Sequence, residues 1–173
     1  MTTKAENDIA EPRYKLAQSE GLSTWENHAD KKIPVDLNEI IEAMGVRLIE
    51  FHPPAGFHSD GATSIDATGF CTIMYRKDVS EERQRFTLAH ELGHIILEHI
   101  SFDGSTSQYS GGSQEKEANA FAGALLVPSK DIKAFMKNGD KNLEDIIRRY
   151  QVSKEVASIA INANKLLNKV RID

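Results

Sequence analysis

The chain of 173 residues has a single cysteine, Cys71, one tryptophan, and no long apolar run. One cysteine cannot form a disulfide within the chain, so the disulfide-stapled secreted domains are excluded, and Cys71 is expected to be a small apolar residue in a strand. No stretch approaches the roughly 18 apolar residues of a membrane span. The first residues lack the apolar segment of a secretory signal. We therefore expect a cytoplasmic protein with no membrane partner.

Positive charge is scarce over most of the sequence. Residues 1–129 carry 11 Lys and Arg against 20 Asp and Glu, a net charge of −9, whereas residues 130–173 carry 10 against 6, a net charge of +4. An acidic surface repels the phosphate backbone of nucleic acids. Direct DNA binding is therefore not expected, and only the basic C-terminal segment leaves it open as an alternative.

The pattern that indicates chemistry is His90, Glu91 and His94 in the order HExxH, within a largely apolar stretch that predicts a helix. On a helix the two histidines lie on one face, about 6 Å apart along the axis, so both imidazoles can bind one metal ion. Glu91 is rotated by about 100° and reaches toward a water on the metal. This is the arrangement of zinc-dependent hydrolases, with Glu91 as the general base. The alternative is a buried helix whose histidines only hydrogen-bond to neighbours.

A catalytic zinc usually has three protein ligands, and the next predicted helix, residues 114–128, offers two carboxylates. A helical wheel places Glu115 within the apolar stripe and Glu117 on the opposite face. Because a buried carboxylate is costly unless it is paired or bound to metal, Glu115 is predicted as the third ligand and Glu117 as a solvated side chain. Asn119, one turn further, is predicted to hold a ligand by a hydrogen bond. The alternative for Glu115 is a frayed first-turn residue that the helix dipole favours.

The remaining segments predict an α+β fold with a small, mainly antiparallel sheet packed on the HExxH helix. The expected elements are a helix that follows Asp36 and ends at Gly45, and strands at 46–51, 62–65 and 69–75. Three regions are expected: an N-terminal helical segment (1–32), the core with the metal site (33–129) and a helical C-terminal extension packed on it (130–173).

Several residues are open candidates for lesser roles. His52 and His58 lie in a loop with prolines and a glycine, where surface imidazoles are commoner than metal ligands. Residues 101–113 form a polar, glycine-rich loop that is either a lid or a surface connection. Tyr75, Tyr109 and His99 are candidates for oxyanion stabilisation. His99 is more simply explained as a helix C-terminal histidine that the dipole favours.

The C-terminal extension predicts three helices, at 130–137, 143–150 and 154–168, the last two capped by Asn142 and Ser153. The last two have the outline of a helix-turn-helix. The final helix offers few base-reading side chains near its start. An appendage that packs on the core or holds its substrate is therefore favoured over a DNA-binding unit.

Two stretches carry a family resemblance. Residues 83–94 read Arg-x-Arg-Phe-Thr-x-Ala-His-Glu-x-Gly-His, and residues 115–128 read Glu-x-x-Ala-Asn-x-Phe-Ala-x-x-Leu-Leu-x-Pro. In this order they resemble the ImmA/IrrE metallopeptidases, whose likeness extends over about residues 33–160. The resemblance implies that His90, His94 and Glu115 bind zinc and that Glu91 is the base, in agreement with the helical wheel.

The family resemblance also implies a function. It implies a zinc-dependent endopeptidase of narrow specificity whose partner is a protein substrate, a helix-turn-helix (Xre-type) repressor of a phage, mobile-element, toxin-antitoxin or stress circuit. Zn²⁺ is the expected cofactor. The alternative is a non-proteolytic module that keeps the zinc fold and sequesters a repressor or antitoxin. The presence of Glu91 argues against that alternative, because binding alone needs no general base.

Overall fold

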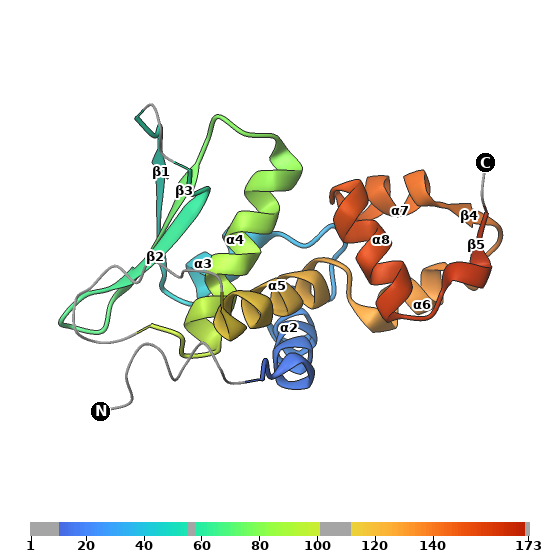
Figure 1. The fold of residues 1–173 in the computed structure, drawn as a ribbon, viewed down its shortest axis with the longest axis horizontal. Helices are drawn as coiled ribbons and strands as arrows, with labels where there is room; N and C mark the ends of the chain where they lie inside the picture. Colours follow the sequence, from blue (N-terminus) through green and yellow to red (C-terminus); the bar gives the residue numbers. More distant parts are fainter. Residues whose placement is uncertain (1–10, 55–57, 101–111, 172–173) are drawn as a thin grey trace.

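The computed structural model of the chain describes residues 11–54, 58–100 and 112–171. Its first part contains α2 (Tyr14–His28), α3 (Leu37–Ala43), β1 (Arg47–Phe51), β2 (Gly61–Ile65), β3 (Cys71–Arg76), α4 (Glu81–Ile96) and α5 (Ser113–Leu126). A second part, here called the C-terminal lobe (residues 129–171), contains α6 (Ser129–Phe135), β4 (Lys141–Asn142), α7 (Leu143–Tyr150), α8 (Lys154–Ala163), the 3-10 helix η1 (Leu167–Lys169) and β5 (Val170–Arg171). Figure 1 shows the sheet at one end of the molecule and the lobe at the other, with α4, α5 and α2 between them.

The predicted α+β class is confirmed, but the sheet, predicted as mainly antiparallel, is mixed. Its strand order is β1-β3-β2, with β3 parallel to β1 and antiparallel to β2. Thr63 on β2 and Ile73 on β3 face each other in the register, and both side chains are fully buried. Because β2 and β3 both contact α4, the sheet covers one side of the helix that carries the HExxH residues.

Helix α4 begins where its sequence predicts. The Ser80 side chain accepts a hydrogen bond from the backbone N–H of Arg83, and Glu81 and Glu82 occupy the first turn, where the helix dipole favours negative charge. Its apolar residues Leu88, Ala89 and Leu92 are buried in the hydrophobic core. The helix is therefore anchored along its length, as a platform for rigidly held ligands requires.

Helix α5 is covered on two faces. Helix α4 packs against one of them, and α2 packs against the other, with Gly21 next to α5. On α5, Phe121 and Leu125 are fully buried. Figure 1 shows α2 beneath α5, on the side away from the sheet. Helix α2 therefore shields one face of α5 from solvent.

The C-terminal lobe has its own polar contacts. The side chain of Asp131 accepts hydrogen bonds from the Arg149 guanidinium, at 2.9 to 3.1 Å, and from the Tyr150 hydroxyl, at 2.6 Å. Asn142 and Asp145 form the capping box of α7. Helix α8 ends at Ala163, earlier than the predicted 168, because Lys165 adopts a left-handed conformation with φ of 56°.

The structure agrees with the sequence on its single cysteine and its lack of long apolar runs. Cys71 is the first residue of β3 and is half-buried. Burial raises the pKa of its thiol, so Cys71 behaves as a small apolar residue. Among the helices in the described ranges, none combines the length and the apolarity that crossing a membrane requires.

Candidate metal centre

The structure brings His90, His94 and Glu115 together into one cluster, here called the metal triad. One ligand atom from each lies within 4.8 Å of the others. His90 and His94 lie one turn apart on α4, and their Nε2 atoms are 3.0 Å apart. Glu115, in the first turn of α5, places Oε2 3.4 Å from His90 Nε2 and Oε1 3.3 Å from His94 Nε2. The packing of α5 against α4 therefore supplies the third member.

The spacing within the triad fits zinc. Zinc ligands at about 2.0 to 2.1 Å in tetrahedral geometry lie about 3.3 Å from one another. The nitrogen–nitrogen and nitrogen–oxygen distances in the triad, 3.0 to 3.4 Å, match that value. Two imidazoles and one carboxylate are also a donor set that catalytic zinc sites use.

The ionisation of the triad also suits a cation. Burial and the neighbouring His90 lower the pKa of His94 to about 4, so its imidazole is neutral at pH 7. Burial opposes the charge on Glu115, but the contacts of the carboxylate with the two histidine rings outweigh burial and lower the pKa of that carboxyl to about 2. For His90, the same carboxylate outweighs burial and raises the pKa above its ordinary value. A bound cation competes directly with that proton.

Glu91 lies on the sheet side of α4. It is 5 % exposed, and the Thr63 hydroxyl donates a hydrogen bond of 2.6 Å to its Oε2. Gly61, on the same strand as Thr63, leaves the necessary room, because a Cβ there would lie 3.0 Å from Glu91 Oε1. Burial raises the pKa of Glu91 above its ordinary value. Strand β2 thus fixes the carboxylate that the sequence predicts as the general base.

Behind the triad, each histidine has a partner for its other ring nitrogen. Asn119 Oδ1 lies 2.9 Å from Nδ1 of His90, as the sequence predicts. Nδ1 of His94 lies 3.0 Å from Nδ1 of His99. Nε2 of His99 lies 3.1 Å from Oε2 of Glu117, and Arg13 donates to both oxygens of Glu117 at 2.7 to 3.0 Å.

The position of His99 follows from the way α4 ends. Glu98 adopts a left-handed conformation with φ of 57°, and its N–H bonds to the Ile95 carbonyl. The N–H of His99 then bonds to the carbonyl of His94 at 2.9 Å. This pair of bonds is a Schellman motif, which folds the chain back over the last turn. His99 is 6 % exposed. It therefore lies against His94 instead of at an exposed helix end.

The prediction that Glu117 is solvated is wrong. Glu117 is only 3 % exposed and is paired with Arg13 and His99. The helical wheel was correct that Glu117 and Glu115 point in different directions, but α2 covers the second face of α5. A signal was present, because Glu117 stands four and eight residues before Phe121 and Leu125, which are buried.

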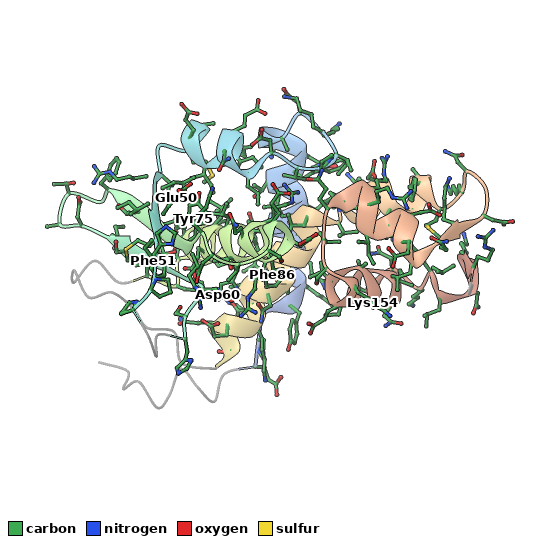
Figure 2. All side chains as sticks on the ribbon, turned by 90° about the horizontal axis from the view of Figure 1, so that it is seen from above. Glu50, Phe51, Asp60, Tyr75, Phe86 and Lys154 are labelled. Carbon is green, nitrogen blue, oxygen red and sulfur yellow. The ribbon has the colours of Figure 1, made fainter. Side chains whose placement is uncertain are left out.

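The other candidates lie elsewhere. The Tyr75 hydroxyl donates to Glu50 on the neighbouring strand at 2.8 Å, and Figure 2 shows the two together at the sheet. Within the described residues, the metal-binding cluster contains neither His52 nor His58. Tyr109 and most of the candidate lid, residues 101–111, lie outside the described residues.

Comparisons with known proteins agree with this geometry. The sequence profile of a peptidase family, described as the IrrE N-terminal-like domain, matches residues 41–162, more than half of the chain. No curated protein matches the sequence. A solved structure of a Mycobacterium tuberculosis transcriptional regulator is similar, with a TM-score of 0.54 and 15 % identity over 83 % of this chain. The chain spans 45 % of that regulator's length. At this identity the likeness establishes a shared fold.

Proposed function

Because the chain belongs to the IrrE N-terminal-like peptidase family, we propose that it is a zinc-dependent endopeptidase that cleaves a narrow class of protein, a helix-turn-helix repressor of the Xre type. The observation that carries the proposal is the convergence of the metal triad with a buried Glu91 on the adjoining face of α4. A metal site that served only to hold the fold together would have no use for that carboxylate.

The metal triad, Glu91 and Thr63 have different roles in the proposed reaction. His90, His94 and Glu115 would hold the zinc ion, which when bound supplies the Lewis acidity that polarises a scissile carbonyl and acidifies water. Glu91 accepts the proton of the attacking water and delivers it to the leaving amide nitrogen. The Thr63 hydroxyl, at 2.6 Å from Oε2, restricts the rotation of the Glu91 carboxylate. Burial of Glu91 raises its pKa, which brings the base closer to neutral pH.

The charge distribution supports a DNA-binding protein as substrate. Residues 1–129, which contain the triad, carry a net charge of −9. DNA-binding proteins present basic surfaces, so an acidic enzyme attracts them and repels the DNA itself. The sequence resemblance to the ImmA/IrrE family supports the same target. A narrow target also implies that cleavage of a general substrate such as casein is a poor test.

The proposal is tested by incubating the purified protein, after its zinc content is measured, with the helix-turn-helix protein encoded beside its gene. We expect about one zinc per chain and a discrete cut. The matched control is Glu91→Gln, which keeps the shape of the side chain and an oxygen for Thr63. It should retain zinc and lose at least about 100-fold in cleavage rate, because general acid–base catalysis contributes about 10²–10⁴.

Two results would contradict the proposal. Cleavage by Glu91→Gln at the wild-type rate would exclude the base role of Glu91. Zinc-loaded wild-type protein that binds the repressor tightly without cutting it would instead indicate the sequestering module.

A further inference from the structure

We propose that His99, Glu117 and Arg13 form a positioning chain that fixes the tautomer of His94, so that the Nε2 lone pair of His94 is directed into the metal triad. The inference rests on the metal site of the proposed function and not on the identity of the substrate. It adds three residues to that site: His99 from the turn after α4, Glu117 from α5, and Arg13, the N-cap residue of α2.

The direction of the chain follows from its charged end. A neutral imidazole has one nitrogen that donates a hydrogen bond and one that accepts. Glu117 is an acceptor through both oxygens, so the His99 nitrogen beside it, Nε2 at 3.1 Å, must donate. Nδ1 of His99 is then the acceptor, and Nδ1 of His94, at 3.0 Å, is the donor. This leaves Nε2 of His94 as the nitrogen with a lone pair, and that nitrogen is the one in the triad.

The opposite arrangement places like groups against each other. If Nε2 of His94 carried the proton, His94 could not bind a metal through it, and Nδ1 of His99 would have to donate. Nε2 of His99 would then direct a lone pair at the Glu117 carboxylate. In a buried site such a contact between two acceptors is costly. The side chains of His99 and Glu117 are 1 % and 4 % exposed, so water cannot readily relieve it.

Arg13 donates to both oxygens of Glu117, so the carboxylate acts as an acceptor in this chain. Its side chain donates to Oε2 through Nε at 3.0 Å and through Nη2 at 2.7 Å, and its backbone N–H donates to Oε1 at 2.9 Å. Nη2 of Arg13 also lies 3.5 Å from Nε2 of His99. That contact is longer than the 3.1 Å to the carboxylate, so the carboxylate decides the tautomer.

The two zinc-binding histidines are thus oriented in different ways. His90 is held directly by Asn119, whose Oδ1 accepts from Nδ1. His94 is held through the imidazole of His99, which in turn hydrogen-bonds to Glu117, the partner of Arg13. The side chain of His94 is fully buried, whereas that of His90 is 15 % exposed. The outer nitrogen of His94, Nδ1, contacts His99, and the chain continues from there through Glu117 to Arg13.

A matched pair of variants separates positioning from packing. His99→Leu fills the space of the imidazole and removes the acceptor for Nδ1 of His94. His99→Asn places an amide oxygen near the position of Nδ1 and so keeps that acceptor. We expect zinc affinity, measured by competition with a chromophoric chelator, to fall about 10- to 100-fold in His99→Leu and to stay within about threefold of wild type in His99→Asn. Thermal melts of the zinc-free proteins control for folding.

The tautomer is read directly by nitrogen-15 NMR of the histidine rings in the zinc-loaded wild-type protein. We expect His99 to carry its proton on Nε2 and His94 on Nδ1. Equal zinc affinity for His99→Leu and wild type would overturn the proposal, and so would a loss in His99→Asn as large as in His99→Leu, or a His99 proton on Nδ1. Failure of the wild-type protein to bind zinc at all would instead contradict the metal site.

Discussion

The N-terminal helix α2 and the C-terminal lobe both lie outside the unit formed by the sheet and α4, and they relate to the metal triad in opposite ways. Helix α2 lies along α5, and its N-cap residue Arg13 binds Glu117 directly. The lobe lies at the other end of the molecule from the sheet, where Figure 2 shows Lys154 far from Glu50 and Tyr75. Its principal polar cluster is internal, with Asp131 bound by Arg149 and Tyr150.

The extent of the family match suggests the reverse, that the C-terminal lobe and not α2 belongs with the metal triad. The residues that match the peptidase family, 41–162, include most of the lobe and exclude α2. The contacts behind the triad nevertheless run to α2. The faces that two helices bury against each other therefore define the extent of a metal site better than the boundaries of a sequence match do.

The largest expected effect comes from Gly21, which lies directly against the backbone of α5. A Cβ at Gly21 would lie 2.5 Å from the Phe121 carbonyl oxygen and 3.0 Å from the Ala124 Cβ. Gly21→Ala should therefore push the helices apart and lower the free energy of unfolding by about 1–3 kcal/mol. Because Arg13 is the N-cap residue of the same helix, zinc affinity should fall as well. Chemical denaturation and chelator competition measure the two effects.

Gly123→Ala is the matched control, since Gly123 lies on α5 and a Cβ there would meet nothing within 4 Å. It should be neutral or stabilise the protein by up to about 1 kcal/mol through helix propensity, with zinc affinity unchanged. Wild-type stability and zinc affinity in Gly21→Ala would show that α2 is not coupled to the triad.

The sequence predicts the local part of the metal centre well. His90, Glu91 and His94 share one helix, so their geometry follows from helical spacing alone. The helical wheel selects Glu115 because it falls within the apolar stripe of its helix, and the structure brings it to the histidines. The α+β class and the helix and strand positions follow from capping residues and apolar periodicity in the same way.

The part that sequence reasoning missed depends on contacts between segments. The burial of Glu117 requires α2 to cover α5, and the Arg13 contact spans 104 positions in the chain. The placement of His99 requires a left-handed residue at position 98, and this position carries Glu instead of the Gly that normally signals such a turn. The spacing of Glu117 to Phe121 and Leu125 indicates a buried face of α5, but it does not reveal that Arg13 and His99 pair with the carboxylate there. The placement of His99 leaves no periodic pattern in the sequence.

A smaller effect is expected at Arg85, which joins α4 to the lobe. Its guanidinium donates to the backbone carbonyls of Val35, Gln151 and Tyr150 at 3.0, 3.2 and 3.5 Å. Arg85→Met keeps the apolar stem and removes these donors, so the free energy of unfolding should fall by about 1–2 kcal/mol. Zinc affinity should not change, because these partners lie outside the triad.

The control for Arg85 is Arg148→Met, an exposed arginine within the lobe, which should change stability by less than about 0.5 kcal/mol. Limited proteolysis should show earlier cleavage in the lobe of Arg85→Met than in that of Arg148→Met. A loss of zinc affinity in Arg85→Met would mean that the lobe and the triad are coupled through α4.

The smallest effect is expected inside the lobe, at Tyr150. Its ring is fully buried, and its hydroxyl donates to Asp131 at 2.6 Å. Burial raises the pKa of this hydroxyl, so it is protonated and able to donate at neutral pH. Tyr150→Phe should lower the free energy of unfolding by about 1 kcal/mol, because Arg149 still pairs with Asp131.

The control for Tyr150→Phe, which lies in the C-terminal lobe, is the same substitution on α2. Tyr14→Phe, on α2 and 46 % exposed, makes the same chemical change at a surface position and should shift the unfolding free energy by less than about 0.5 kcal/mol. Denaturant melts measure this difference, and zinc titration should give the wild-type affinity for both variants. If Tyr150→Phe weakened zinc binding, the lobe would have to transmit strain through α8, which contacts α5. The lobe would then belong to the metal centre as fully as α2 does.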